Sequence, residues 1–211
     1  MTRQKKSAFA LYKKHFVDND FERFDLFQKL AGKYRIKNVL YPGSFVHITP
    51  SLVFPRVVYV DSYKKAEDFF KDPSICTYIQ EHKNYSQEAE VLFHKSDYNK
   101  NFGEKECSFD LLISQWAGFI SKACKKYLKI GGLLVANNSH RDASMASIDN
   151  DYEFIAVYNN RGNNYTISGR NLDQYFVRKS NTMVTKEYVE NAKRGISYRK
   201  TASGYIFKRV N

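Results

Sequence analysis

Two short segments, NVLYPGS at residues 38–44 and VVYVD at residues 57–61, give the strongest indication of how this chain folds. Each contains a short apolar run that leads into a residue suited to a turn or a ligand, Gly43 in the first and Asp61 in the second. Uninterrupted apolar runs are typical of strands that are buried on both faces of a parallel sheet. Glycine after the first strand lets the backbone approach a ligand closely, because no Cβ lies in the way.

Three more apolar runs continue this pattern, and polar residues follow each of them. We expect strands at residues 90–93, 109–113 and 133–136, and helices at 63–71 and 116–129. Buried strands that alternate with helices predict an α/β domain whose mostly parallel, doubly wound sheet is covered on both faces.

The two ends of the chain depart from this alternation. Aromatic residues at helical spacing predict two helices within residues 4–31, with a break and an N-cap at Asp18-Asn19-Asp20 and a C-cap at Gly32. This segment can cap a ligand site or cover the sheet. Towards the other end we expect two strands, a helix and a final strand, at 152–158, 165–167, 186–193 and 204–210. Because no linker divides the chain, we expect one domain over 1–211, with a helical extension at 1–32 and an α/β core at 36–210.

Composition and charge restrict the function less than they restrict the fold. A formal net charge of +12 favours contact with nucleic acid or another polyanion, although a soluble surface explains the same excess and no basic tail concentrates it. No apolar stretch approaches the roughly 18 residues that a membrane helix needs, and we see no signal-peptide pattern. The three cysteines lack the C-x-x-C spacing of a zinc site or a redox pair. We therefore expect a cytoplasmic protein with no membrane segment and no metal site.

Several short motifs resemble those of the class I S-adenosylmethionine-dependent methyltransferases. VLYPGS at 39–44 stands in the place of the family's first glycine-rich motif, and Asp61 follows Gly43 by 18 residues. A carboxylate at that interval can accept hydrogen bonds from both hydroxyls of a ribose. Ser96-Asp97 takes the place where family members often hold adenine, and DLLISQ at 110–115 resembles the segment that faces the methyl group.

The resemblance spans about residues 36–210 and implies a Rossmann-like sheet with an antiparallel C-terminal strand and S-adenosylmethionine as the cofactor. The residues that it places against the cofactor are Tyr41, Gly43, Ser44, Asp61, Ser62, Ser96, Asp97 and Ser114. Two departures set the chain apart, since Tyr41 replaces the family's usual acidic residue and no second glycine follows Gly43 closely. The absence of a G-x-G-x-x-G fingerprint makes a nicotinamide dehydrogenase a poorer match.

Candidate residues for catalysis and substrate binding follow the first, fourth and fifth strands. Gln115 can orient an acceptor, and His140 is the candidate general base because imidazole titrates near neutral pH. Trp116 can stack on a flat acceptor or on a sulfonium. The residues expected to bind substrate are His47, Trp116, Asn138 and Arg141. Core packing of Trp116 and a solvated loop at 137–142 are the structural alternatives.

Three functions are compatible with these motifs. The first is an enzyme that transfers a methyl group from S-adenosylmethionine to a small molecule or a macromolecule. The second is a catalytically inactive module of the same fold that binds nucleic acid or a protein partner, which the net charge of +12 and the missing acidic residue favour. The third is an enzyme on the same scaffold that uses another nucleoside ligand. The sequence leaves the acceptor and the oligomeric state open.

Overall fold

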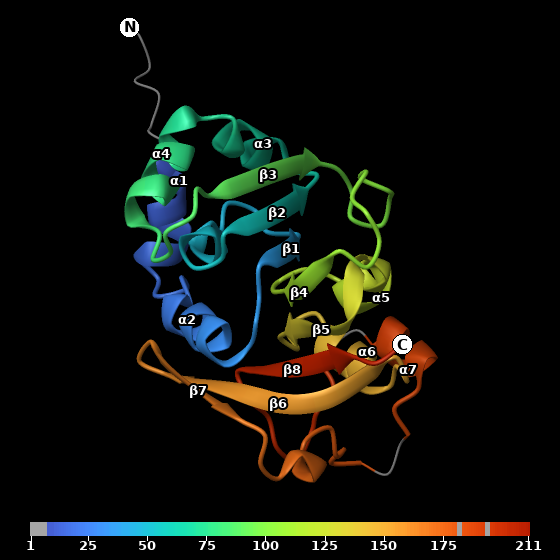
Figure 1. Ribbon diagram of the computed structural model, residues 1–211. Helices are drawn as coiled ribbons and strands as arrows, with labels where there is room; N and C mark the ends of the chain where they lie inside the picture. Colours follow the sequence, from blue (N-terminus) through green and yellow to red (C-terminus); the bar gives the residue numbers. More distant parts are fainter. Residues whose placement is uncertain (1–7, 181–182, 193–194) are drawn as a thin grey trace, which may run out of the picture.

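An eight-stranded mixed sheet runs through the centre of the computed structural model, which describes residues 8–180, 183–192 and 195–211 (Figure 1). The strands lie across the sheet in the order β3-β2-β1-β4-β5-β8-β6-β7. Each overlaps a strand that the sequence predicts. Their bounds are β1 Asn38–Pro42, β2 Arg56–Asp61, β3 Glu90–Lys95, β4 Phe109–Ser114, β5 Leu128–Ala136, β6 Tyr152–Arg161, β7 Asn164–Ser168 and β8 Gly204–Arg209.

The first five strands are parallel, and the direction of the connections reverses between β1 and β4, which pair with each other. β8 runs antiparallel between β5 and β6, and β7 pairs with β6 as an antiparallel edge strand. Parallel strands present their carboxyl ends at one edge of a sheet, so the ends of β1, β2 and β4 meet there. The prediction of a mostly parallel sheet with an antiparallel final strand is confirmed.

Helices that connect the strands along the chain pack on the faces of the sheet. Their bounds are α1 Ala8–Tyr12, α2 Phe24–Lys33, α3 Lys64–Phe70, α4 Pro73–His82, α5 Ile120–Ala123, α6 Asp142–Ser147 and α7 Lys186–Asn191. One π-helical turn, Lys13–Val17, continues α1, and short 3-10 turns lie at Thr49–Leu52, Lys125–Tyr127 and Leu172–Gln174. Residue 193, the predicted end of α7, lies outside the described residues.

Alternate residues of each strand point into different cores, so both faces of the sheet are buried. On one face Val39 and Tyr41 belong to a cluster that includes Leu26 of α2. On the other face Leu40 belongs to a cluster that includes Ile120 of α5. A third cluster joins α1, α3 and α4 beside β3. This two-sided burial explains why the strands read as uninterrupted apolar runs in the sequence.

The segment between β4 and β5 corrects the prediction of one helix over 116–129. Trp116 has a φ of 62°, so the chain bends there and does not enter a helix. Only Ile120–Ala123 forms an α-helix, and a 3-10 turn leads from it into β5. β5 begins at Leu128, within the segment that was predicted to be helical.

The N-terminal helices are present, but the predicted cap residues are not the ones that end or begin α2. Residues 4–7 of the predicted first helix lie outside the described residues. The first helical segment ends at Asp18, as the sequence indicated. The N-cap of α2 is Arg23, which has a φ of 58° and makes no side-chain cap hydrogen bond, and Gly32 lies inside the helix.

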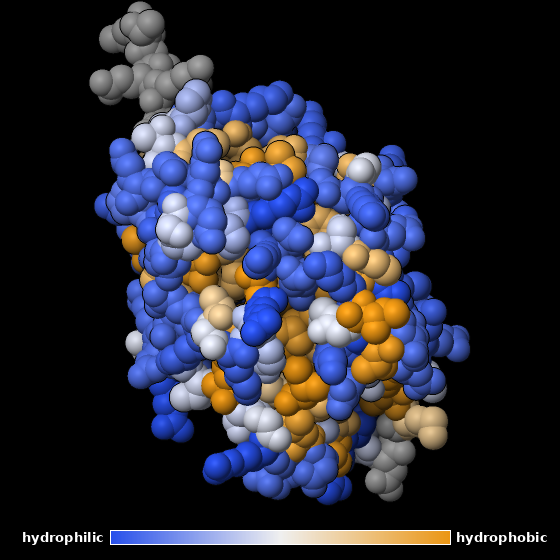
Figure 2. All heavy atoms as spheres, viewed as in Figure 1, coloured by the Kyte–Doolittle hydropathy of each residue, from blue (hydrophilic) through white to orange (hydrophobic). Residues whose placement is uncertain are grey.

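Hydrophilic side chains cover most of the face seen in Figure 2, and hydrophobic ones come to the surface mainly over its lower half. Within the described ranges, no helix has both the length and the hydropathy that crossing a membrane requires. In those same ranges, no three His, Cys, Asp or Glu side chains are grouped as ligands for a metal ion.

Candidate functional site

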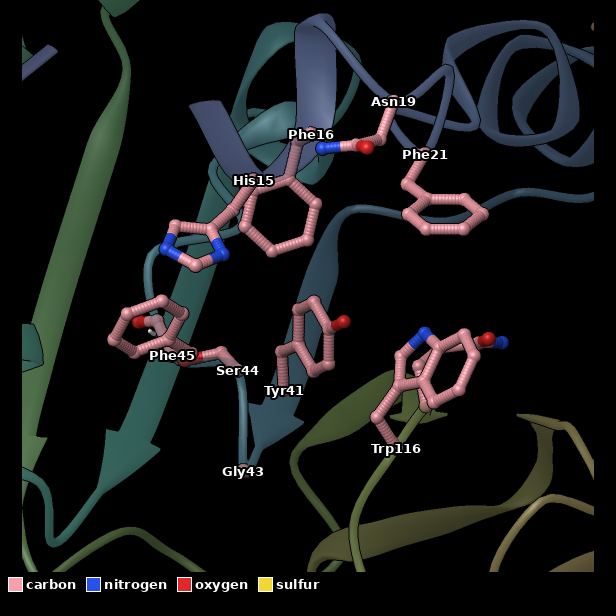
Figure 3. Close-up of a pocket in the computed structure, with 10 residues that line it drawn as sticks. His15, Phe16, Asn19, Phe21, Tyr41, Gly43, Ser44, Phe45 and Trp116 are labelled. Atoms are coloured by element: carbon pink, nitrogen blue, oxygen red, sulfur yellow. Dashed lines mark hydrogen bonds between the residues drawn. The ribbon is translucent and has the colours of Figure 1, made fainter. Parts of the chain in front are cut away.

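A pocket of about 360 Å³ opens where the ends of β1 and β4 meet, under the N-terminal segment (Figure 3). Open α/β sheets bind ligands at this position, where the strand order reverses. None of the described residues that line the pocket is acidic. The lining residues are His15, Phe16, Asn19 and Phe21 before α2, Tyr41, Gly43, Ser44 and Phe45 at the end of β1, and Gln115 and Trp116 after β4.

Aromatic rings form most of the pocket wall. In Figure 3 the rings of Phe16 and Phe21 lie on one side, and those of Tyr41 and Trp116 lie on the other. Trp116 is 52% exposed, and its ring centroid lies 6.0 Å from that of Phe21. Trp116 is therefore not a core residue, and a flat ligand that covered these rings would gain binding free energy from the buried apolar surface.

A chain of polar contacts lies behind the pocket at Gln115. This buried side chain donates from Nε2 to the Tyr158 hydroxyl at 3.0 Å and accepts from Asn137 Nδ2 at 3.1 Å. Because both ends of the amide have partners, its orientation on the pocket lining is fixed. Gln115 thus lies where an acceptor could reach it, and its role in orienting one stays a prediction.

His47 lies beneath the pocket and is fully buried. Nε2 is 3.0 Å from the Glu22 carbonyl oxygen, and since a carbonyl only accepts, Nε2 carries the proton and Nδ1 accepts from the Tyr41 hydroxyl at 3.0 Å. The ring stacks on Phe16 at 4.3 Å. Burial, and after it the charge of Arg23, lowers the pKa of His47 to about 3. The structure corrects the expected substrate contact, because this neutral ring ties the N-terminal segment to β1.

Gly43 directly follows β1, and Asp61 is the last residue of the neighbouring strand β2, as the sequence predicted. The Asp61 carboxylate accepts hydrogen bonds of 2.8 Å from the backbone N–H groups of Phe45 and Tyr63. An ionised carboxylate offers about four acceptor positions, so part of its capacity remains for hydroxyl groups. Asp61 therefore holds the glycine turn against β2 and can still accept from a ribose.

The space directly in front of the Gly43 Cα is filled by protein. A Cβ at this position would lie 2.5 Å from the Ala117 Cβ and 4.0 Å from the Tyr98 ring, which comes from the loop after β3. The sequence predicted that a ligand could approach the backbone closely at this glycine, and the two side chains occupy that space. A nucleoside that approached the Gly43 Cα would meet these two side chains, so residues 115–118 and Tyr98 would have to move for it to bind there.

Ser114 makes a buried structural contact in place of the expected cofactor contact. Its hydroxyl donates to the Asp142 carboxylate at 2.5 Å, and Ser121 donates to the same carboxylate from its hydroxyl at 2.5 Å and from its backbone N–H at 3.0 Å. Complete burial raises the pKa of Asp142 to about 6, and the hydrogen bonds from the two serines act against that rise. The cluster joins the end of β4 to α5 and α6.

The other cofactor candidates lie in different environments. Ser44 is buried on the pocket lining. Ser62 is exposed, and Ser96 is half-buried with its hydroxyl donating to the Asp97 carbonyl oxygen at 3.2 Å. The exposed Asp97 carboxylate accepts from the backbone and side chain of Asn99, each at 2.9 Å. Their contacts with a cofactor stay predictions.

The loop after β5 does not contribute to the pocket lining. Asn138 accepts from the backbone N–H and the hydroxyl of Ser144, each at 3.0 Å, and so holds the start of α6. His140 is exposed, and its Nδ1 lies 3.1 Å from the hydroxyl of the preceding serine. The Arg141 guanidinium lies 5.6 Å from the Phe119 ring centroid. The general-base role of His140 and the substrate contacts of Asn138 and Arg141 remain predictions.

Sequence reasoning missed the contribution of the N-terminal segment to the pocket. Helical spacing of aromatic residues indicated a buried face, but it left open whether that face caps a site or covers the sheet. The structure shows both, because Phe16 and Phe21 line the pocket while α2 packs on the sheet. No role was predicted for Arg23, and no pattern in the sequence distinguishes it from the other arginines.

Comparison with known proteins agrees with this architecture. No protein-family model and no curated protein matches the sequence. A proposed O-methyltransferase from Klebsiella pneumoniae superposes with a TM-score of 0.52 at 11% identity, over 79% of this chain and 89% of that chain. Phosphoethanolamine N-methyltransferase 1 from Haemonchus contortus, solved with phosphoethanolamine and S-adenosylhomocysteine, gives a TM-score of 0.50 at 11% identity, over 91% of this chain and 43% of that one. The chain therefore has the Rossmann-like fold of the class I S-adenosylmethionine-dependent methyltransferases.

Proposed function

We propose that this chain is an S-adenosylmethionine-dependent methyltransferase whose acceptor binds in the aromatic pocket between β1 and β4. The placement of Gly43 and Asp61 at adjoining strand ends carries the proposal, because Asp61 keeps acceptor capacity where a ribose would lie. The pocket beside them has the volume and the largely aromatic lining of a small-molecule site. The fold supports the same class of reaction without identifying the acceptor.

The cofactor supplies a methyl group on a positively charged sulfur. Transfer of such a group depends on orienting the acceptor and excluding water. In this proposal Asp61 holds the ribose, and residues 115–118 together with Tyr98 leave the front of Gly43 when the nucleoside enters. The closed arrangement assigns no residue to the transfer itself.

A second candidate is a module of this fold that binds a macromolecule and has no turnover. The contact between Ala117 and Gly43 favours it, because a permanently closed glycine turn has no use for a nucleoside. The net charge of +12 makes nucleic acid the first ligand to test. Electrophoretic mobility shifts with DNA and RNA at several salt concentrations distinguish it, since phosphate contacts give a steep salt dependence.

Isothermal titration with S-adenosylmethionine and S-adenosylhomocysteine tests the first candidate. We expect one site in the wild-type protein and affinity weaker by about tenfold or more in Asp61→Asn, because a hydrogen bond to a charged group contributes about 1.5–3 kcal/mol. Asp173→Asn, which changes an exposed carboxylate in the 3-10 turn at 172–174, is the matched control and should bind normally. Absence of heat with both compounds would refute methyl transfer from this cofactor.

A further inference from the structure

Among the residues that the structure describes, Arg23 is a buried cation with no acidic partner. Its side chain belongs to a residue that is only 9% exposed, and within the described ranges no carboxylate oxygen lies within 4 Å of it. Its one hydrogen bond there runs from Nη1 to the Phe21 carbonyl oxygen at 3.1 Å. A guanidinium has several further N–H donors, and burial of an unpaired charge costs free energy.

The neighbouring acidic residues do not neutralise Arg23, although three of them lie within three positions of it in the sequence. They are Asp20, which accepts from Asn163, Glu22, which accepts from Tyr12, and Asp25, which pairs with Lys29. Arg23 also has a φ of 58° and occupies the N-cap position of the ten-residue helix α2. Both features cost free energy. That φ is strained for a residue with a side chain, and the N-terminal end of a helix favours an anion rather than a cation.

Arg23 is not itself a lining residue, but its guanidinium lies beside two rings that line the pocket. Its carbon is 5.9 Å from the Phe21 ring centroid and 6.0 Å from the Trp116 ring centroid, and these two rings both line the pocket. Burial raises the pKa of the Tyr41 hydroxyl, and the charge of Arg23 acts against that rise, so the cation also acts electrostatically on Tyr41, another residue of the pocket lining. A charge at this place acts on whatever fills the pocket.

We propose that the pocket binds a flat anion of the aromatic carboxylate class, with Arg23 as its counter-charge. The rings of Phe21 and Trp116 would cover the plane of such a ligand, and the guanidinium would bind its carboxylate through parallel hydrogen bonds. The lining carries no acidic side chain to repel an anion, and the overall charge of +12 attracts one. The inference rests on the proposed function only in naming this molecule as the methyl acceptor.

Tryptophan fluorescence measures binding at this pocket directly, because Trp116 is the only tryptophan of the chain. The probes are benzoate, its neutral isostere benzamide, the cation benzylamine, and acetate, which has the charge without the ring. We expect benzoate to bind wild-type protein at least about tenfold more tightly than the other three, as a charge-assisted hydrogen bond predicts. Arg23→Gln should bring benzoate and benzamide within about twofold of each other.

Two control variants separate the role of Arg23 from a general loss of charge. Arg23→Lys keeps the charge without the planar fork and should retain a smaller preference for benzoate. Arg170→Gln removes an exposed charge that follows β7 and is not among the pocket-lining residues, and it should bind as wild type does. Equal affinity of wild-type protein for benzoate and benzamide, tighter binding of benzylamine, or an unchanged preference in Arg23→Gln would overturn the proposal.

The same titrations, repeated with and without S-adenosylhomocysteine, distinguish this inference from the proposed function. Preference for benzoate without any binding of S-adenosylhomocysteine would support the anion site and refute the proposed methyl transfer. Binding of S-adenosylhomocysteine without a preference for benzoate would retain the enzyme and refute the anion site.

Discussion

Replacement of Gly43 by alanine tests the contact that closes the strand ends. The new Cβ would lie 2.5 Å from the Ala117 Cβ, well inside van der Waals contact, and Gly43 has a φ of +63°. A residue with a side chain at such a φ loses about 1 kcal/mol, and overpacking adds about 1–3 kcal/mol. We therefore expect Gly43→Ala to lower the free energy of unfolding by about 2–4 kcal/mol.

Gly162→Ala is the matched control for this change, because Gly162 has a φ of +55° and no atom lies within 4 Å of a Cβ there. It should lose only the backbone contribution, about 1 kcal/mol. Urea unfolding followed by circular dichroism measures both values, provided that the slope with denaturant stays constant. The double variant Gly43→Ala/Ala117→Gly should regain most of the overpacking loss. If Gly43→Ala proves no costlier than Gly162→Ala, Ala117 does not fill this space and the closed site is wrong.

Three further substitutions should change stability or ligand binding in a direction that the structure predicts. Burial lowers the pKa of His47 from 6.5 to about 3 in the folded protein. The neutral ring therefore contributes its full stabilisation above pH 6.5, and this contribution falls by about 1.4 kcal/mol for each pH unit below 6.5. Urea unfolding between pH 3 and 7 should show a weaker acid dependence in His47→Gln than in wild type or in the exposed-site control His82→Gln, and equal curves would count against the buried ring. The pKa of Asp142 is raised from 3.8 to about 6, so this group alone makes stability fall as pH rises from about 4 to about 6. The free energy of unfolding of wild type minus that of Asp142→Asn should therefore fall as pH rises over that range, and a constant difference would contradict the burial of the carboxylate. Tyr98→Ala removes the second side chain in front of Gly43 and should tighten the binding of S-adenosylhomocysteine in calorimetry, whereas weaker binding would mean that the ring contacts the nucleoside.

The sheet was predictable because each of its strands satisfies two-sided burial locally. Val39, Leu40 and Tyr41 point alternately to opposite cores, so all three have to be apolar and the run is visible without any tertiary information. Gly43 and Asp61 follow directly from the strand ends, which is why their neighbouring positions were predicted correctly. Periodicity therefore located the edge of the sheet where the pocket opens.

The interior of the site was not predictable, because it depends on contacts between distant segments. Apolar spacing made 116–129 look helical, but the chain bends at Trp116, and the following residue, Ala117, packs against Gly43 from a distant part of the sequence. His47 was predicted to bind substrate and Asp142 was placed in a polar loop, whereas burial by other elements makes both of them structural groups with shifted pKa values. Arg23 has no local signal at all, since its neighbours in the sequence include acidic residues that the fold directs elsewhere.

The central claim is that a nucleoside enters at Asp61 and displaces residues 115–118 from Gly43. Titration with S-adenosylhomocysteine while the fluorescence of Trp116 is recorded tests this most directly, because the single tryptophan lies next to Ala117. We expect a saturable change whose midpoint moves to a ligand concentration about tenfold or more higher in Asp61→Asn and stays unchanged in Asp173→Asn. A signal that stays constant up to millimolar ligand, with no heat of binding, would contradict the claim.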